Sequence, residues 1–432
     1  MKLWAKEHTV NQAFVEQFTV GRDPEFDLLL AKYDVQGSLA HTEMLASVGL
    51  LTTGEWESIR QGLQEIQVEI DANRFVIEPG VEDVHSQIEL LLTRRIGEAG
   101  KKIHSGRSRN DQVAVDIKLF LRAGLTEVQT MVLALFEQWL QLSEQHKDVL
   151  LPGYTHLQVA MPSSFGLWFG AWAESLVDDM DLLLTAKRMC NKNPLGSGAG
   201  YGSSFPLNRG LTTGLLQFEA MHYNSVYAQM SRGKTEKIVA MALANLGSTL
   251  ARFSMDICLY MSQNFGFISF PDELTTGSSI MPHKKNPDIF ELIRAKGNRL
   301  QALPNELSLL LTNLPSGYHR DLQLTKEILF PALEELKNCL RMLEYALPQI
   351  RVNQDILKDE RYRYLFSVEA VNELVQQGIP FREAYQTIGK QIEAGNFQWD
   401  TSRPLQHTHE GSIGRLCLDE IRAAMQRVLE RA

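Results

Sequence analysis

One stretch rich in serine, lysine and small residues, GSSIMPHKKNPD at Gly277–Asp288, combines groups that could handle an anion. Asn286 is a good helix N-cap and is followed by proline, so we predict a helix that begins here with its positive end toward the loop. Lys284 adds charge to that end, and Ser278 lies in a glycine-led loop that could close over a ligand. The stretch predicts an anion-binding lid, although an ordinary connection before a helix has a similar composition.

A second segment, HSGRSRNDQVAVD at His104–Asp116, leads into a long helical pattern. Arg107, Ser108 and Asn110 offer several hydrogen-bond donors beside the predicted helix start, where a carboxylate could bind. The alternative is a basic, solvated loop capped by Asp111. Composition alone favours neither interpretation.

Three further polar sites lie between apolar runs. LPGYTHLQVAMP, at Leu151–Pro162, places Thr155 and His156 in a turn, although a single histidine is more often structural than catalytic. SGYHRDLQLTK, at Ser316–Lys326, would by itself indicate an exposed helix start. His85, in EDVHSQIE, equally suits the first turn of a helix. None of these sites identifies a function alone.

Composition argues against several classes of function. The eleven histidines show no compact ligand spacing such as H-E-x-x-H, and the glycine run at Gly196–Ser203 does not follow a predicted strand. We therefore predict no metal and no other cofactor. The formal net charge of -9 disfavours nucleic acid and anionic membranes as partners.

The sequence also predicts a soluble, cytoplasmic protein. Four scattered cysteines fit a reducing compartment. The start MKLWAKEHTV lacks the apolar run of a signal peptide, and no apolar stretch approaches the ~20 residues that span a bilayer.

Taken together, the motifs resemble a known family. GSSxMPxKxNP is the signature of the fumarase, aspartase and argininosuccinate lyase superfamily, and Gly277–Pro287 contains every fixed position. GRSRNDQ at Gly106–Gln112, GYTHLQ at Gly153–Gln158 and YxxDLQxxK at Tyr318–Lys326 resemble the argininosuccinate lyases in particular. The resemblance implies a mainly α, three-domain fold with a central bundle of long helices.

The resemblance further implies β-elimination of argininosuccinate to arginine and fumarate. This reaction removes a weakly acidic proton beside a carboxylate, so positive charge and aligned amides must stabilise the dianion that forms. By analogy with the family, Ser278 would be the base, and Lys284 and Asn286 would stabilise the intermediate. His156, oriented by Glu291, would protonate the leaving group.

The same analogy assigns substrate contacts to several segments. These residues are His85, Arg107, Ser108, Asn110, Thr155, Tyr318, Gln323 and Lys326. No short stretch contains all of them, and the superfamily builds each site from three chains. The resemblance therefore implies a homotetramer whose subunits share active sites.

Two places depart from the family pattern. Where relatives often place a substrate-binding serine, GRDPEFD puts Asp23, which leaves that contact open. The family's S-D-R-D stretch appears as Ser231–Lys234, which keeps the arginine and loses both acidic residues. We interpret the second departure as a variation within the lineage rather than as lost activity.

Long helices are predicted to position these segments. Between Gln112 and Leu151 apolar residues recur at three- and four-residue steps without proline, which predicts one amphipathic helix. Similar patterns cover 165–190, 235–265, 322–345 and, with a kink expected at Pro304, 287–313. Strand signals are scarce. The predicted domains are 1–105, 106–350 and 351–432.

Two alternative functions remain open. Another fumarate-releasing lyase, such as adenylosuccinate lyase, aspartase or fumarase, would share the lid but not GRSRNDQ. A non-catalytic, helical structural protein of the same family would have no need of Ser278, Lys284 and His156.

Overall fold

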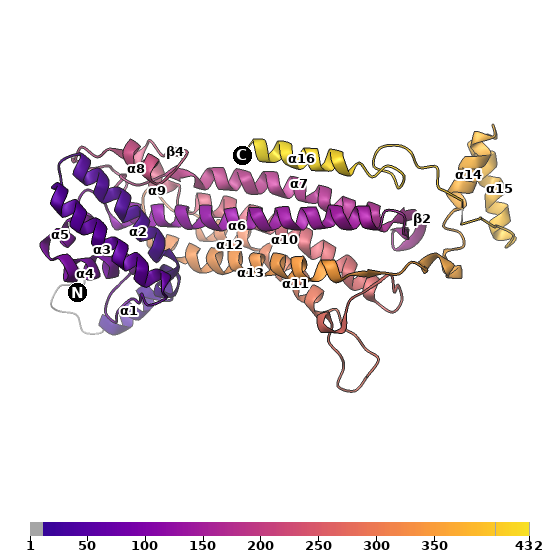
Figure 1. Cartoon of the computed structure of the whole chain (residues 1–432), viewed down its shortest axis with the longest axis horizontal. Helices are drawn as coiled ribbons and strands as arrows, with labels where there is room; N and C mark the ends of the chain where they lie inside the picture. Colours follow the sequence, from indigo (N-terminus) through magenta and orange to yellow (C-terminus); the bar gives the residue numbers. More distant parts are fainter. Residues whose placement is uncertain (1–11, 402, 432) are drawn as a thin grey trace. The chain divides into compact units, whose positions relative to one another are not determined.

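The computed structural model describes residues 12–401 and 403–431 and is mainly helical, as predicted (Figure 1). The expectation of no signal peptide in Met1–Val10 lies outside the described residues. The α-helices are α1 (Gln12–Val20), α2 (Asp23–Ser47), α3 (Thr53–Asp71), α4 (Val84–Ile96), α5 (Glu98–Lys101), α6 (Arg109–Gln145), α7 (Phe165–Cys190), α8 (Arg209–Leu215), α9 (Ser225–Met230), α10 (Lys234–Met261), α11 (Asp288–Leu300), α12 (Leu303–Leu310), α13 (Leu324–Ala346), α14 (Ser367–Gln376), α15 (Phe381–Glu393) and α16 (Leu418–Glu430).

Short 3-10 helices and strands complete the described fold. The 3-10 helices are η1 (Lys102–His104), η2 (Asp272–Leu274), η3 (Arg320–Gln323), η4 (Leu347–Gln349), η5 (Ile356–Lys358) and η6 (Glu360–Tyr362). The strands are β1 (Leu150–Thr155), β2 (Gln158–Ser164), β3 (Lys192–Asn193), β4 (Ala220–Met221), β5 (Ile268–Ser269) and β6 (Arg351–Val352). They form two-stranded pairs, β1–β2 and β5–β6 antiparallel and β3–β4 parallel.

The predicted long helices are confirmed, with ends shifted by a few residues. α7 covers the predicted 165–190, and α6, α10 and α13 lie close to their predicted ranges. The helical stretch 287–313 divides into α11 and α12, with Pro304 in the first turn of α12. Pro331 lies inside α13, at a position where a break would be the local expectation.

The chain forms two compact units. Unit 1 comprises residues up to Gln129, Leu182–Asn245 and Arg299–Leu336. Unit 2 comprises Thr130–Asp181, Leu246–Asn298 and the chain from Lys337 onward. α6, α7, α10 and α13 contribute residues to both units. The division into three domains stays a prediction.

In unit 1, α2, α3, α4 and α5 pack together (Figure 1). Their shared core includes the buried side chains of Leu45, Ile59 and Ile88, each of which contributes roughly 1.5–3 kcal/mol on burial. Thr52 starts α3 with a capping box, because its hydroxyl accepts from the Glu55 N–H while the Glu55 carboxylate accepts from the Thr52 N–H. This packing holds α4, which carries His85, against α2.

Also in unit 1, the first part of α6 packs against the first part of α13. The rings of Phe120 and Phe330 have centroids 4.0 Å apart. The two helices approach so closely that a Cβ atom on Gly124 would lie 2.4 Å from Leu333 Cδ2. This contact brings together the segments that contain the starts of the two helices, 104–116 and 316–326.

Unit 2 has an aromatic core. Trp139 of α6 and Phe253 of α10 have ring centroids 4.8 Å apart, and Trp168 of α7 stacks on the same phenylalanine at 5.6 Å. β1 and β2 form a hairpin beyond α6 in the sequence, with Tyr154 packed edge-on against Phe265. α14 and α15 pack on each other around a small apolar cluster of their own (Figure 1).

Two helical stretches, Arg109–Gln145 and Ser225–Met261, are long and apolar enough to cross a membrane by length and composition alone. The expectation that no stretch approaches that length is therefore wrong. In the second stretch 67% of the most apolar window is buried inside the protein. In the first, the Lys118 side chain is buried and its Nζ donates to Thr235 Oγ1 at 3.2 Å. We interpret both stretches as core helices.

Candidate active site

A cavity of 870 Å³ lies in unit 1, a size that suits a small-molecule substrate. Its walls come from the starts of α2, α4 and α6 and from η3 with the start of α13. Five of the predicted substrate residues line it: His85, Asn110, Tyr318, Gln323 and Lys326. Segments far apart in the sequence thus meet at one cavity.

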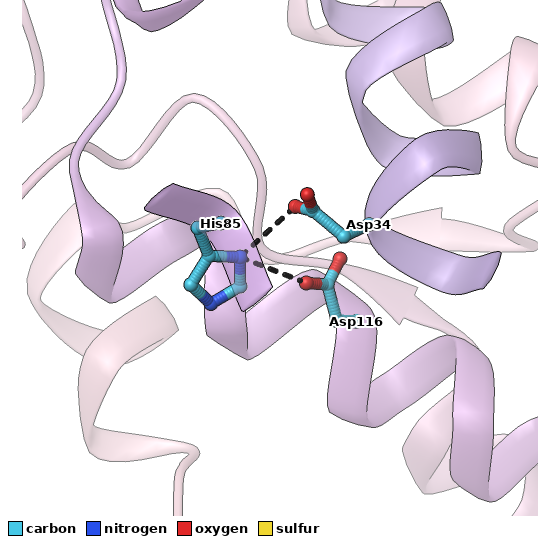
Figure 2. A group of neighbouring side chains, drawn as sticks. All are labelled: Asp34, His85 and Asp116. Carbon is cyan, nitrogen blue, oxygen red and sulfur yellow. Dashed lines mark hydrogen bonds and ion pairs between the residues drawn. The ribbon is translucent and has the colours of Figure 1, made fainter. Parts of the chain in front are cut away.

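His85 is fixed by two buried carboxylates (Figure 2). Its Nδ1 atom lies 3.0 Å from Asp34 Oδ1 and 3.5 Å from Asp116 Oδ2. Gln112 Nε2 donates to the same Asp34 oxygen at 2.6 Å. Because both carboxylates face Nδ1, that nitrogen carries a proton, and Nε2 is left for the cavity that His85 lines.

Burial and close neighbours set the charges of this cluster. Burial favours a higher pKa for Asp34, but His85, Arg107 and Gln112 outweigh it and lower the pKa to about 2. Burial and the neighbouring Asp34 carboxylate raise the pKa of Asp116. Asp34 is therefore the ionised partner of His85 at neutral pH.

Arg107 and Ser108, also predicted to touch substrate, do not line the cavity. The guanidinium of Arg107 is buried and donates to Ser38 Oγ at 3.0 Å. The hydroxyl of Ser108 accepts from the Asn110 N–H at 3.3 Å. Their substrate contacts stay predictions.

Asp111 ties this segment to the glycine run. Its Oδ1 accepts from the Ser108 N–H at 2.8 Å, and its Oδ2 accepts from the N–H groups of Gly196 and Gly198, both at 2.9 Å. Burial raises the pKa of Asp111 to about 6 despite these bonds. Both glycines have positive φ, so the run serves to let the backbone fold onto one carboxylate.

Lys326 is buried and paired with two carboxylates. Its Nζ atom lies 2.6 Å from Asp23 Oδ1 and 2.5 Å from Asp27 Oδ1. Burial favours a lower pKa for Lys326, but the two carboxylates outweigh it and raise the pKa. Gln323 donates to the backbone carbonyls of Thr19 and Val20 and so holds η3 against α1.

The departure at Ser231–Lys234 has a structural explanation. Gly233 has φ +75°, and a Cβ there would lie 2.3 Å from Leu311 Cδ2. Its N–H donates to Glu236 Oε2 at 2.7 Å, while Arg232 Nε donates to Glu236 Oε1 at 3.1 Å. Glu236, in the first turn of α10, therefore supplies the carboxylate that pairs with Arg232, the arginine that this chain retains from the family stretch.

In unit 2, Thr155 and His156 lie at the tip of the β1–β2 hairpin. Thr155 pairs with Gln158, so His156 and Leu157 form the two-residue turn. Both turn residues have positive φ, 54° and 58°, although neither is glycine. Two-residue hairpin turns commonly have positive φ at both positions, a conformation that is costly for a leucine. The predicted turn is confirmed, whereas the strands that present it were not expected.

The predicted lid is the loop between η2 and α11, which extends away from its neighbouring helices (Figure 1). The loop closes at its base, where Thr276 and Asn286 exchange two backbone hydrogen bonds of 3.2 and 2.8 Å. Within it, Ser278 Oγ accepts from the N–H groups of Ile280 and Met281, at 3.3 and 3.1 Å. Two amide dipoles therefore point at the hydroxyl oxygen predicted to act as base.

The charged groups of the lid differ in what they contact. Lys285 forms an ion pair with Asp272, whereas the exposed Lys284 side chain makes no hydrogen bond or ion pair among the described residues. The predicted N-cap role of Asn286 is wrong. Its Nδ2 donates to Thr276 Oγ1 at 3.2 Å, which holds the base of the loop, and α11 begins only at Asp288.

Glu291, predicted to orient His156, lies on the exposed first turn of α11. Among the described residues of one chain it pairs with Arg294 at 3.8 Å and makes no hydrogen bond with His156. The predicted site residues thus divide into a unit 1 group around the cavity and a unit 2 group on the hairpin, lid and α11.

The sequence interpretation missed the carboxylates behind the cavity. Asp34 opens the DVQGS stretch and Asp116 ends the second segment, but no spacing relates them to His85. The three side chains have donor atoms within 4.8 Å of one another and are of the types that can hold a metal ion. Within the cluster, His85 Nδ1 makes its hydrogen bond to Asp34 and a longer, 3.5 Å contact with Asp116.

Comparison with known proteins first defines the class. The family described as lyase matches this chain over residues 9–302. An argininosuccinate lyase of Bacteroides fragilis is 60% identical over 429 residues, which cover 99% of this chain and 95% of that protein. An argininosuccinate lyase of Methylococcus capsulatus is 43% identical and covers 91% of this chain and 84% of its own length. The chain belongs to the argininosuccinate lyase family.

Solved structures share the fold at lower identity. An EDDS lyase variant with bound fumarate has a TM-score of 0.75 at 22% identity, over 96% of this chain and 89% of that one. A class II fumarase from Schistosoma mansoni has a TM-score of 0.70 at 15% identity, over 96% and 95%. These likenesses confirm the predicted fumarase/aspartase-like fold.

Proposed function

We propose that this protein is a cytoplasmic enzyme of arginine biosynthesis that splits argininosuccinate into L-arginine and fumarate. The chain's membership in the argininosuccinate lyase family supports argininosuccinate as the substrate. The observation that carries the chemistry is the pair of backbone N–H groups directed at Ser278 Oγ.

Ser278 is the base that removes the proton beside the succinyl carboxylate. A serine hydroxyl titrates far above neutral pH, so its alkoxide requires strong local stabilisation. The amides of Ile280 and Met281 provide it, since a preorganised donor at an oxyanion contributes about 3 kcal/mol. Lys284 and Asn286, on the same loop, stabilise the dianionic intermediate.

His156 protonates the guanidinium nitrogen that leaves as arginine. The β1–β2 hairpin presents it on an exposed tip, and Thr155 beside it contacts substrate. Glu291 orients this histidine. Among the described residues of one chain it pairs with Arg294 instead, so we propose that the contact with His156 is made across a subunit interface.

The remaining predicted contacts hold the substrate in the unit 1 cavity. His85 and Asn110 contribute from α4 and α6, and Tyr318, Gln323 and Lys326 from η3 and the chain around it. Arg107 and Ser108 also contact the substrate. Both lie in the segment that the hydrogen bonds of Asp111 hold in place. Each site combines residues from three subunits of a homotetramer.

The test is fumarate release, followed by ultraviolet absorbance, from purified protein given argininosuccinate, adenylosuccinate, aspartate or malate. We expect release from argininosuccinate alone, with a loss of more than about a thousandfold in Ser278→Ala. Ser58→Ala, on the exposed face of α3, is the matched control. Release from another substrate would move the function within the superfamily, and silence with all four would favour a structural protein.

Shared sites have a separate test. Light scattering should give the mass of a tetramer. Ser278→Ala and Lys326→Met are each expected to be inactive, and mixed tetramers of the two should recover activity if a site draws these residues from different subunits. No recovery from verified mixed tetramers would contradict sharing.

A further inference from the structure

Two carboxyl groups lie close together in the interior, behind the unit 1 cavity (Figure 2). Asp34 of α2 is 1% exposed and Asp116 of α6 is 0% exposed, and neither lines the cavity. One oxygen or nitrogen atom from each of Asp34, Asp116 and His85 lies within 4.8 Å of the others. Two negative charges this close repel each other strongly when they are buried, so full ionisation of both carboxyl groups is unfavourable.

The two carboxyl groups differ in their hydrogen-bond partners. Asp34 Oδ1 accepts from His85 Nδ1 at 3.0 Å and from Gln112 Nε2 at 2.6 Å. Among the described residues, both oxygens of Asp116 and the second oxygen of Asp34 are buried without a donor. His85 Nδ1 lies 3.5 Å from Asp116 Oδ2, but it makes its hydrogen bond to Asp34. A buried carboxylate without a donor is costly, because nothing replaces the water that it loses on folding.

One proton on Asp116 would remove this deficit. A protonated carboxyl group has an O–H donor, and the vacant Oδ2 of Asp34 is an acceptor beside it. Burial raises the pKa of Asp116, and Asp34 raises it further through its charge and through a hydrogen bond between the two side chains. Such a bond requires a proton on one of them. At Asp34 the charged and hydrogen-bonded neighbours outweigh burial and lower the pKa to about 2, so the proton belongs to Asp116.

The other charged groups around Asp116 do not replace this proton. Arg107, just before α6, lowers the pKa of Asp116, whereas Asp27 of α2 raises it. The Arg107 guanidinium donates to Ser38 Oγ at 3.0 Å, and its Nε is buried without an acceptor. A divalent cation could satisfy the same carboxyl oxygens, but its charge would be buried near that guanidinium, an unfavourable arrangement.

The charge of Asp116 bears directly on that of His85. Two carboxylates at Nδ1 would favour the imidazolium ion, whose Nε2 donates, whereas one carboxylate and one neutral acid favour a neutral ring, whose Nε2 accepts. We propose that Asp116 is a carboxylic acid that donates to the Asp34 carboxylate and thereby keeps His85 neutral, with Nε2 accepting from an N–H or O–H donor of the substrate. The substrate contact rests on the proposed function, whereas the protonation of the three side chains does not. Asp116 is thus a positioning residue.

Infrared spectroscopy of the intact protein in D2O at pH 8 tests the proton on Asp116. Asp23 and Asp111, whose pKa values burial raises to about 6, are ionised at that pH. We expect a C=O band of a protonated carboxyl group that Asp116→Asn loses and Asp71→Asn, at the exposed end of α3, keeps. A wild-type spectrum without any such band would overturn the proposal, as would an unchanged band in folded Asp116→Asn.

The charge of His85 has its own measurement, nitrogen-15 NMR of the intact protein labelled at histidine, with His85→Gln to assign the signals. In a neutral ring one nitrogen carries hydrogen and the other does not, so their chemical shifts are widely separated. We expect this separation for His85 at pH 8 in the wild type. Two similar shifts, as in an imidazolium ion, would contradict the proposal without the use of any Asp116 variant.

Fumarate release from argininosuccinate tests the consequence for activity. Asp116→Ala removes the donor to Asp34, so kcat/KM should fall at least about tenfold. Asp116→Asn has nearly the shape of the acid and keeps an N–H donor, so it should restore most of that loss and keep the wild-type pH profile. Thermal unfolding shows whether each variant is folded. A folded Asp116→Asn that is as impaired as Asp116→Ala would make the proposal wrong.

Elemental analysis of the intact protein distinguishes a proton from a metal ion. One divalent cation per chain, lost in Asp116→Asn, would overturn the proposal, because the cation would then occupy the place of the proton. If both spectra agree with the proposal but argininosuccinate releases no fumarate, the proposed reaction fails while the protonation of Asp116 stands.

Discussion

Nδ1 of His85 lies 3.0 Å from Oδ1 of Asp34, and both side chains are almost wholly buried. The pair fixes the tautomer and the direction of the one imidazole that α4 brings to the cavity. An Asp–His pair of this kind presents Nε2 without rotational freedom. The relationship joins α2 to α4 and makes Asp34 a positioning residue for His85.

Asp34→Asn should therefore damage activity and stability together. The buried pair loses its charge, and the amide oxygen is a weaker acceptor for His85 and Gln112 than the carboxylate oxygen that both contact. We expect kcat/KM for argininosuccinate to fall at least about tenfold, with a stability loss of about 3 kcal/mol. Fumarate release and denaturant unfolding measure the two effects. Asp71→Asn, at the exposed end of α3, should change neither.

Asp111 should give a pH-dependent stability. Burial raises its pKa to about 6, above an unfolded value of about 4. A carboxyl group with a raised pKa contributes stability that is complete below about pH 4 and is lost as the pH rises through about 6. The unfolding free energy of the wild type relative to Asp111→Asn should therefore decline between pH 4 and 7, by roughly 1–3 kcal/mol. A difference that rises with pH would contradict the assignment.

The hairpin tip should tolerate glycine in its second turn position. Leu157 has φ 58° and is 74% exposed, so its side chain adds strain and few contacts. Leu157→Gly should raise the unfolding free energy by up to about 1 kcal/mol, because glycine adopts this conformation without strain. The midpoint of thermal unfolding measures it. A clear fall in the midpoint would mean that Leu157 does not have the positive φ described.

Gly233 should not tolerate a side chain. Its φ is +75°, and a Cβ would meet Leu311 Cδ2 at 2.3 Å. Gly233→Ala should cost roughly 1–3 kcal/mol of stability, and Gly54→Ala, where nothing lies within 4 Å of the added Cβ, is the control. Equal stability of the two variants would contradict the described contact.

Local sequence determined the long helices and the lid. Apolar residues three and four positions apart predict a helix from local sequence alone, so α6, α7, α10 and α13 could be predicted from short-range pattern. Pro331 inside α13 shows where packing outweighs local preference. The lid and the GRSRNDQ segment were recognisable because their residues are contiguous.

The tertiary structure alone decided which polar groups meet. Lys326 and Asp27 are 299 positions apart, and Asp34 and His85 are 51 apart, so no periodicity relates them. Side chains this distant become partners only when helices pack, and burial then changes their charges, as in Asp23 and Asp116. The sequence thus determined the helices and the lid loop, whereas packing decided the pairing, the burial and the ionisation of the carboxylates around the cavity.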